Sequence, residues 1–560
     1  MPRPGAPIRT VVVGAGAAGV PLAVRLSEDP GREVVLLEAG PVGEPPAELL
    51  DGATLPAAVP GHPANWGFAA ELFPGAGTIV PRGRIVGGSS AINGGYFVRA
   101  TAGDFEHWER EGGPAWSYRS ALPILESLED DLDFGDAPGH GSQGPMRVRR
   151  AHGDLVDAFE RAAEQLGFRA EPDKNAPGAL PGVGPVPSNI VDGVRVSTAM
   201  AYLPLVAEHD RLTVRGDARA LRVRVDDGRV SGVEVLIATP AGSASTCFIP
   251  ADEVVLCAGA VMTPQLLMLS GIGPRAELEA LGIPVVADLP VGAGFHDHPN
   301  LALLWRSTGD PPTLERGPAF PAALNFDASG DAGLRPEGDL EILLTAQPEH
   351  ALFGAGDPSH ERAGDPGSMS GSGFGPNPSS RPGSAPSSRP GSDSSPRHGL
   401  GQTADDPAVE LRLMIALQQP RSRGRLSLRS ADPLEPPRIE YRYLEHAEDR
   451  DRLRTGVRTA VELLRAPALA GRFGGLVDLD DRTLADADAL DAWIRAHLGT
   501  AIHLCGTAPM GPVVDGAGRV HGIGGLRVAD TSMLPSAPSR GPFCTAVLIG
   551  ELIARRMRGE

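Results

Sequence analysis

Three glycines and an acid near the N-terminus have the spacing of a dinucleotide-binding turn. A short apolar run at residues 10–13 leads into Gly14, Gly16 and Gly19, and Glu38 follows nineteen residues after the last glycine. The first glycine permits the turn, the second lets the main chain approach a pyrophosphate, and the third lets a helix pack on a strand. A carboxylate at the fourth position accepts hydrogen bonds from ribose hydroxyls and repels a 2′-phosphate. FAD or NAD is therefore favoured over NADP.

These residues need a strand, a tight turn, a helix and a second strand to position them. Residues 10–13 fit the first strand, a helical pattern follows Gly19, and the apolar run at residues 33–37 fits a second strand that ends at Glu38. The helix N-terminus would present free N–H groups and a positive dipole end to phosphates. A glycine-rich turn alone is a weak signal, but this combination strongly favours a dinucleotide site.

Composition restricts the class of protein. A chain of 560 residues can form two or more domains with a large core, and a net charge of −19 disfavours a nucleic-acid partner. No apolar run reaches the length of a transmembrane segment, and the N-terminus lacks a secretion signal. We therefore expect a cytoplasmic protein, with the arginines at residues 554–558 leaving peripheral contact with an anionic membrane open. None of the four cysteines forms a CxxC pair, so no metal site is predicted.

A second glycine-rich stretch lies at residues 82–99. Its Gly-Gly-Ser-Ser sequence at residues 87–90 indicates a backbone that packs closely on something flat or anionic, and the serines could cap a short helix. A purely structural turn is the alternative. Because it follows a nucleotide-binding unit, the stretch is a candidate for the second half of a cofactor cradle.

Several further segments have readable patterns. Residues 41–81 are rich in proline and glycine and are expected to be mostly loop, whereas residues 221–225 alternate as in an antiparallel strand. Residues 253–257 read as a buried parallel strand. A helix should follow it, with Thr263 as its N-cap and Pro264 at its first position.

Composition changes sharply at residues 354–407. This stretch is rich in glycine, serine and proline and has almost nothing to bury, so disorder is predicted. The strand-like runs at residues 340–344 and 409–417 flank it. We therefore expect an insert that interrupts one domain.

Four motifs together resemble one family, the glucose–methanol–choline (GMC) flavoprotein oxidoreductases. Residues 82–99 resemble its first signature and residues 259–274 its second. Residues 503–511 and 525–532 are similar to the C-terminal part of the family. The motifs occur in the family's order, and the resemblance covers the chain except for the insert.

The resemblance implies an α/β fold: a Rossmann-like FAD-binding domain with a second α+β substrate domain containing an antiparallel sheet. The FAD-binding domain would comprise residues 1–300, with some substrate-domain segments, and residues 500–560. The substrate domain would comprise residues 301–499, interrupted by the insert at 354–407.

The resemblance also assigns cofactor contacts. The ADP half of FAD would lie on Gly14, Gly16, Gly19 and Glu38. The flavin side would be lined by Ile85, Gly88, Ser89, Asn93, Gly94, Gly95 and Tyr96. Ala220 would contact the adenine, and Asp530 would lie near the ribityl chain and pyrophosphate. Some members attach FAD through a histidine where this chain has Ile92, which implies non-covalent FAD.

His503 is implied as the catalytic base. A histidine titrates close to neutral pH and could take the hydroxyl proton while hydride leaves for flavin N5. The family usually has a second histidine or asparagine where this chain has Phe543. His503 would then act alone, Ser539 or Arg540 would substitute, or activity would be weak.

The expected activity is that of an FAD-dependent oxidoreductase acting on CH–OH groups. Residues 93–99 and 189–195 are similar to the mycofactocin-system branch, which is implied to reoxidise reduced mycofactocin and pass electrons to an acceptor linked to the respiratory chain. A choline-type or other alcohol dehydrogenase or oxidase is the alternative. Phe543 supports a third reading, a catalytically impaired flavin-binding electron carrier.

Overall fold

The computed structural model describes most of the chain. The described residues are 7–238, 244–308, 317–328, 338–353 and 409–560. The insert predicted at residues 354–407 lies outside them.

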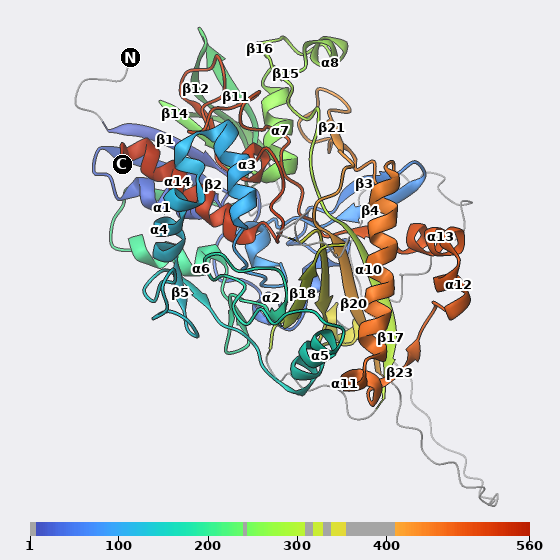
Figure 1. Cartoon of the computed structure of the whole chain (residues 1–560). Helices are drawn as coiled ribbons and strands as arrows, with labels where there is room; N and C mark the ends of the chain where they lie inside the picture. Colours follow the sequence, from blue (N-terminus) through green and yellow to red (C-terminus); the bar gives the residue numbers. More distant parts are fainter. Residues whose placement is uncertain (1–6, 239–243, 309–316, 329–337, 354–408) are drawn as a thin grey trace, which may run out of the picture.

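The glycine turn follows the central strand of a five-stranded parallel sheet (Figure 1). Its strands, in spatial order, are β10 (Leu212–Arg215), β2 (Arg32–Leu37), β1 (Ile8–Val13), β14 (Glu253–Leu256) and β25 (Leu526–Val528). The buried run expected near residue 253 is confirmed as a parallel strand between β1 and β25. Segments from both ends of the chain therefore share one sheet.

Two helices from opposite ends of the chain pack together beside this sheet. Figure 1 shows α1 (Gly19–Ser27), in blue, next to α14 (Phe543–Arg558), in red. Gly550 permits this close approach, because a Cβ there would lie 2.3 Å from the carbonyl oxygen of Ala18. The Arg25 guanidinium also pairs with the buried Glu551 carboxylate at 3.0 Å.

Three predictions for segments near this sheet have different outcomes. The alternating residues 221–225 are confirmed as part of an antiparallel sheet of β11 (Ala218–Asp226), β12 (Arg229–Ala238) and β13 (Ala244–Pro250). The helix boundary expected at Thr263 was wrong, because α7 spans Gly259–Leu269 and contains this threonine. The serines at 89 and 90 lie inside a short 3₁₀ turn, Gly88–Ala91, and do not cap a longer helix.

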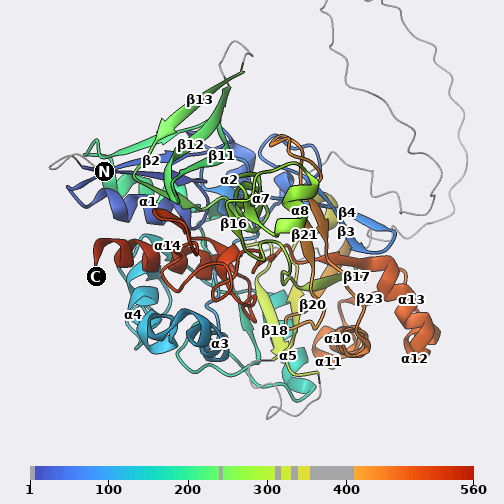
Figure 2. The same cartoon turned by 90° about the horizontal axis from the view of Figure 1, so that it is seen from above.

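A seven-stranded sheet, antiparallel at every described pair, forms the second layer (Figure 2). Its strands are β7 (Val183–Pro185), β17 (Pro299–Ser307), β18 (Ala322–Phe326), β19 (Leu340–Leu344), β20 (Val409–Leu417), β23 (Phe473–Leu476) and β24 (Leu498–Thr500). The two runs that flank the insert, β19 and β20, pair directly. Helix α10 (Ala447–Arg465) packs on this sheet, where a Cβ at Gly456 would lie 2.8 Å from the Ile415 side chain.

Residues 41–81 are more ordered than the expected loop. They contain a hairpin that pairs with one later strand, which itself pairs with another, in a four-stranded sheet. Its strands are β3 (Phe68–Phe73), β4 (Ala76–Val80), β21 (Arg425–Ser427) and β22 (Arg438–Glu440). The Glu71 carboxylate accepts the Gly75 N–H at 2.9 Å, which stabilises the hairpin turn.

The remaining elements connect these sheets. The helices are α2 (Ala47–Leu50), α3 (Ala102–Gly112), α4 (Tyr118–Leu128), α5 (Asp154–Gln165), α6 (Thr198–Tyr202), α8 (Arg275–Ala280), α9 (Glu349–Leu352), α11 (Pro467–Ala470), α12 (Asp481–Ala485) and α13 (Ala487–His497). The short strands are β5 (Glu129–Asp131), β6 (Met146–Val148), β8 (Ile190–Val191), β9 (Val194–Arg195), β15 (Ile272–Gly273) and β16 (Ala287–Asp288). Among the described residues, none of the helices combines the length and apolar character needed to cross a membrane.

Candidate active site

One cavity of about 450 Å³ extends from the glycine turn to the C-terminal histidine. Gly14, Glu38 and Ser89 line it together with His503 and Phe543, so both the N-terminal and the C-terminal motifs reach it. The space is long and has a glycine-rich end and an end beside a histidine. This shape can hold an extended molecule with a reactive group beside His503.

The glycine-rich end is built by close backbone approach. Gly14 has φ +103°, and a Cβ there would lie 2.4 Å from the Cys257 carbonyl oxygen. A Cβ at Gly88 would lie 2.6 Å from the Gly16 Cα. The two glycine stretches predicted from the sequence therefore face each other, and side chains would fill the cradle between them. An extended dinucleotide such as FAD fits this arrangement, because its phosphates need bare backbone N–H groups.

Glu38 lies at the cavity wall directly after β2. Its carboxylate accepts the Ala15 N–H at 3.1 Å and the Gly40 N–H at 2.9 Å. Burial raises the pKa of Glu38 to about 7, and these backbone donors oppose that effect. The carboxylate is thus held in place with acceptor capacity for ribose hydroxyls.

Most of the predicted cofactor residues line the cavity. Those on its wall are Gly14, Gly16, Glu38, Gly88, Ser89, Asn93, Gly94, Tyr96, Ala220 and Asp530. The structure places Gly19, Ile85 and Gly95 behind the wall. Gly19 allows α1 to approach Gly14, Gly95 packs on Ile190, and the Ile85 side chain is in the core.

Asp530 connects β25 to the start of α7. Its Oδ2 accepts the Gly259 N–H at 2.8 Å and the Thr263 hydroxyl at 2.6 Å, and its Oδ1 accepts the Ser532 hydroxyl at 2.5 Å. Burial raises the pKa of this carboxyl. Thr263 is therefore not the N-cap residue, but its hydroxyl links the Asp530 carboxylate to the Ala258 N–H at the start of α7.

The His503 ring contacts a second histidine that the sequence did not reveal. The Nδ1 atoms of His503 and His298 lie 2.9 Å apart, and the two ring planes are at 84°. His298 is fully buried, whereas His503 lines the cavity. The His-Asp-His sequence at residues 296–298 was the available signal, but its proximity to His503 depends on tertiary structure.

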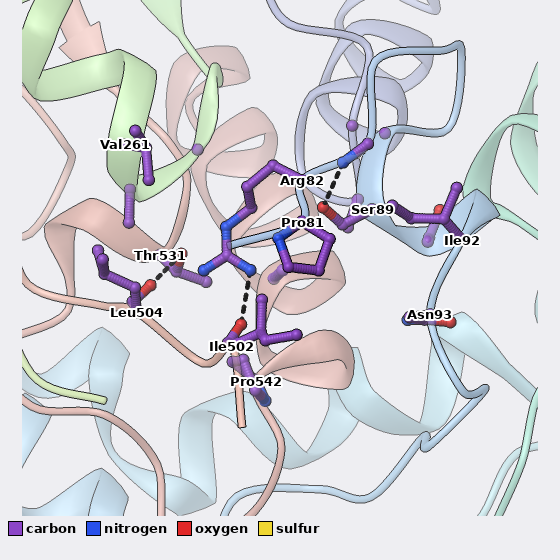
Figure 3. Close-up of a pocket in the computed structure, with 18 of the residues that line it drawn as sticks. Pro81, Arg82, Ser89, Ile92, Asn93, Val261, Ile502, Leu504, Thr531 and Pro542 are labelled. Carbon is purple, nitrogen blue, oxygen red and sulfur yellow. Dashed lines mark hydrogen bonds between the residues drawn. The ribbon is translucent and has the colours of Figure 1, made fainter. Parts of the chain in front are cut away.

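Asp297 fixes the loop that carries His503. Its carboxylate accepts the N–H groups of His503 at 2.8 Å and His298 at 2.6 Å, and the Thr500 hydroxyl at 2.9 Å. Burial raises the pKa of Asp297 to about 6. Ile502 has φ +66°, which is rare for a β-branched residue. Arg82 donates to its carbonyl at 2.6 Å, as Figure 3 shows.

Neither alternative partner expected for His503 occupies that role. The Ser539 hydroxyl donates to Asp104 at 2.7 Å, and the Arg540 guanidinium donates to the Ser539 carbonyl at 2.9 Å. Both side chains are buried away from the cavity wall. Phe543 does line the cavity, and its ring packs edge-on against Phe97 at a centroid distance of 5.1 Å.

Burial keeps both histidines neutral. It lowers the pKa of His298 to about 3 and, with the nearby His298 and Arg82, lowers the pKa of His503 well below its usual value. Two neutral imidazoles in Nδ1–Nδ1 contact share one proton, so one ring donates and the other accepts. The carbonyls of Pro538 and Gln418 lie beside the His298 ring and favour a proton on it, although its Nε2 makes no hydrogen bond of good geometry.

The end of the cavity near His503 is largely apolar. Its apolar wall is formed by Leu55, Phe320, Leu343, Phe353, Met414 and Ala416. Two polar side chains, Asn300 and Glu341, interrupt it. This end can accept the carbon skeleton of a small organic substrate.

Glu129, Asp131 and His140 offer ligand atoms within 4.8 Å of one another, a spacing that could suit a metal. Both carboxylates are already paired with guanidiniums, Glu129 with Arg99 at 2.6 Å and Asp131 with Arg150 at 2.8 Å. Burial lowers the pKa of His140, but hydrogen bonds to Asp131, Asp173 and Glu129 raise it to about 11. The group is best described as a buried ion-pair network.

Comparison with known proteins identifies the family. Residues 9–300 and 420–550 match the N- and C-terminal models described as GMC oxidoreductase. An uncharacterized GMC-type oxidoreductase of Rhodococcus erythropolis is 34% identical over 98% of both chains. An oxygen-dependent choline dehydrogenase of Brucella ovis is 31% identical over 98% of this chain and 95% of the relative.

Solved structures agree with the fold. A pyridoxine 4-oxidase from Mesorbium loti has a TM-score of 0.81 at 25% identity, covering 99% of each chain. A formate oxidase from Aspergillus oryzae has a TM-score of 0.80 at 23% identity, covering 99% of this chain and 98% of the other. The expected α/β fold and an FAD-dependent oxidoreductase acting on CH–OH groups are confirmed. The chain belongs to the GMC oxidoreductase family.

Proposed function

We propose that this protein oxidises a small alcohol, with His503 as the base that removes the hydroxyl proton. The observation that carries the proposal is a neutral histidine on the wall of the cavity, opposite the cofactor cradle. Its Nδ1 is engaged by His298, so Nε2 is the nitrogen available to a substrate. Proton removal by a positioned base accounts for about 10²- to 10⁴-fold of rate.

The cradle residues would hold FAD without a covalent bond. Gly14, Gly16 and Gly88 would admit the pyrophosphate, Glu38 would bind the ribose, and Asp530 would lie near the pyrophosphate and ribityl chain. When bound, the flavin supplies the hydride acceptor of the reaction. Ile92 has no nucleophilic atom, which supports non-covalent binding.

His298 would select the tautomer of His503. A proton on Nδ1 of His503, donated to Nδ1 of His298, leaves the Nε2 lone pair of His503 free for the substrate. The opposite arrangement puts the proton on Nε2 and removes the base. The productive tautomer needs the proton of His298 on Nε2, the nitrogen on the side of the ring away from His503. His298 is thus a positioning residue.

Substitutions of His298 should separate this role from packing. An asparagine places an acceptor near the position of Nδ1, whereas a glutamine places its amide near Nε2. We expect His298→Asn to keep flavin reduction within about tenfold of wild type, and His298→Gln and His298→Ala to slow it about 10- to 100-fold. Stopped-flow measurement of flavin absorbance under anaerobic alcohol gives these rates. Equal rates in the Asn and Gln variants would contradict the tautomer role.

The pH dependence of flavin reduction follows from the lowered pKa of His503. Because the pKa of His503 is lowered, its basic form persists below pH 6.5, the usual histidine value. Flavin reduction should therefore stay constant from neutral into mildly acidic pH in wild type. In His298→Ala, water enters and the neighbouring ring is lost, so the pKa of His503 rises. The pH below which flavin reduction slows should therefore move up towards 6.5.

One assay tests the proposed function. The purified protein should be yellow, and anaerobic choline or pyridoxine should bleach the flavin if it oxidises alcohols of the kinds named for its relatives. Admitting oxygen then distinguishes an oxidase, which reoxidises rapidly, from a dehydrogenase. A yellow protein that no alcohol bleaches would favour the electron-carrier reading.

The mycofactocin reading stays a prediction, and reduced mycofactocin belongs in the same assay as a further substrate. The cytoplasmic location also stays a prediction. We infer that the parallel sheet, with residues 1–300 and 500–560, holds the cofactor. The seven-stranded sheet lies mostly within residues 301–499, takes β7 from the N-terminal part of the chain, and would form the substrate wall.

A further inference from the structure

A single polar row crosses the sheet that walls the substrate end of the cavity. Asn300 on β17 lies opposite Ala416 on β20, and Ala416 lies opposite Glu341 on β19. Glu341 lies opposite Asn325 on β18. Directly paired residues of antiparallel strands point to the same face, so these four side chains form one row.

The neighbouring row of the same face is apolar. Leu343 on β19 pairs with Met414 on β20, two residues along from Glu341 and Ala416. All of these side chains except Asn325 line the cavity. Ala416, between Asn300 and Glu341, is small and leaves room above the polar row.

Glu341 retains acceptor capacity although it is buried. Its Oε2 accepts the Tyr96 hydroxyl at 2.7 Å and the Asn325 amide at 3.0 Å, while its Oε1 accepts, among the residues that the structure describes, only the Gln418 amide at 3.0 Å. A carboxylate has about four acceptor sites. One site on Oε1 is therefore open, and Glu341 lies on the cavity wall.

The polar row lies within reach of the catalytic histidine. A Cβ at Gly541 would lie 2.8 Å from the Tyr96 ring and 3.5 Å from the His503 ring, so these rings flank Gly541. The Tyr96 hydroxyl touches Glu341 at its other end. The distance from His503 to Glu341 is thus on the scale of one tyrosine side chain.

The charge around Glu341 is already balanced. Lys174 donates to Glu171 at 2.5 Å, to the Gly182 carbonyl at 3.1 Å and to Asn325 at 3.1 Å, which uses all its hydrogens. Two cations, Lys174 and Arg540, interact electrostatically with two anions, Glu171 and Glu341, in this part of the structure. A further cation would meet two positive groups, whereas an uncharged donor would not.

From this arrangement we infer that Glu341 is a specificity-determining residue for alcohols that carry a second, uncharged hydroxyl group. One hydroxyl lies at His503, and the other donates to Glu341 Oε1 over Ala416. The inference rests on the proposed function, because it requires that the cavity end beside His503 receives the substrate.

Binding titrations test it separately from turnover. In the FAD-loaded His503→Ala protein, perturbation of the flavin spectrum reports the affinity of 1-butanol, 1,4-butanediol and 4-amino-1-butanol, which share one carbon chain. We expect the diol to bind about tenfold or more tightly than 1-butanol, since a hydrogen bond to a charged acceptor is worth that much. The ammonium should bind more weakly than the diol.

Adding Glu341→Gln should abolish the preference for the diol. The glutamine carbonyl can still accept from Tyr96 and Asn325, and its amide can donate to Gln418 once that side chain rotates, because Gln418 Oε1 is buried without a partner. The open acceptor is thereby removed while the network stays satisfied. The matched control is Glu349→Gln, the same change in a partly exposed ion pair with Arg412.

Each result has a clear meaning. A diol preference that disappears in Glu341→Gln and persists in Glu349→Gln supports the inference. Equal binding of diol and 1-butanol, or an unchanged ratio in Glu341→Gln, overturns it. If the amino alcohol binds more tightly than the diol, the inference that the second group of the substrate is uncharged is wrong. Diol binding without flavin bleaching in the protein that retains His503 would refute the proposed oxidation and leave the binding role of Glu341 intact.

Discussion

Replacing His503 by alanine is expected to lower the rate of alcohol-driven flavin reduction about 10²- to 10⁴-fold, with FAD retained. An alcohol holds its proton too tightly to lose it unaided, and His503 is the histidine on the cavity wall. FAD should remain bound because the glycine cradle and Asp530 lie at the other part of the cavity. Anaerobic stopped-flow absorbance gives the rate, and the FAD released on denaturation gives the occupancy.

A matched substitution controls for the loss of any imidazole. His446 is exposed, and its side chain does not cap α10, so His446→Ala should change neither rate nor occupancy. An unchanged rate in His503→Ala would remove this residue from the mechanism. Loss of FAD in that variant would instead assign His503 to cofactor binding.

Gly88→Ala should remove most of the bound FAD. The new Cβ would lie 2.6 Å from the Gly16 Cα, and backbone on both sides must separate to relieve the overlap. Gly88 also has φ +54°, a left-handed conformation that costs alanine about 1–2 kcal/mol. We expect more than tenfold weaker FAD binding, measured by titrating apoprotein with FAD.

Gly77→Ala is the control for this substitution. Gly77 lies in β4, and nothing approaches within 4 Å of the position of its Cβ. This variant should bind FAD like wild type. If Gly88→Ala also kept full occupancy, the close approach of Gly16 and Gly88 could not be the pyrophosphate site.

Local patterns predicted the cofactor end of the site well. The strand, the glycine turn and Glu38 lie within one short stretch, so their geometry follows from nearby residues. The parallel strand at residues 253–257 was also predictable, because an unbroken apolar run is typical of a strand buried on both faces.

Long-range contacts account for what the sequence could not reveal. His298 and His503 are 205 residues apart, and no periodicity connects them. The start of α7 was misplaced for a similar reason. Asp530, 271 residues away, accepts the Gly259 N–H and so performs the function of an N-cap. Thr263, which looked like the cap, donates its hydroxyl to the same carboxylate.

The strand β25, which completes the parallel sheet, comes after all of its other strands in the chain. During translation β1, β2, β10 and β14 leave the ribosome first, at about 5–20 residues per second. Their sheet lacks its last strand until residues 526–528 are made, and His503 and Asp530 also arrive late. A nascent chain therefore exposes the unpaired edge of β14. The cradle is incomplete until the residues of β25 and Asp530 have been made.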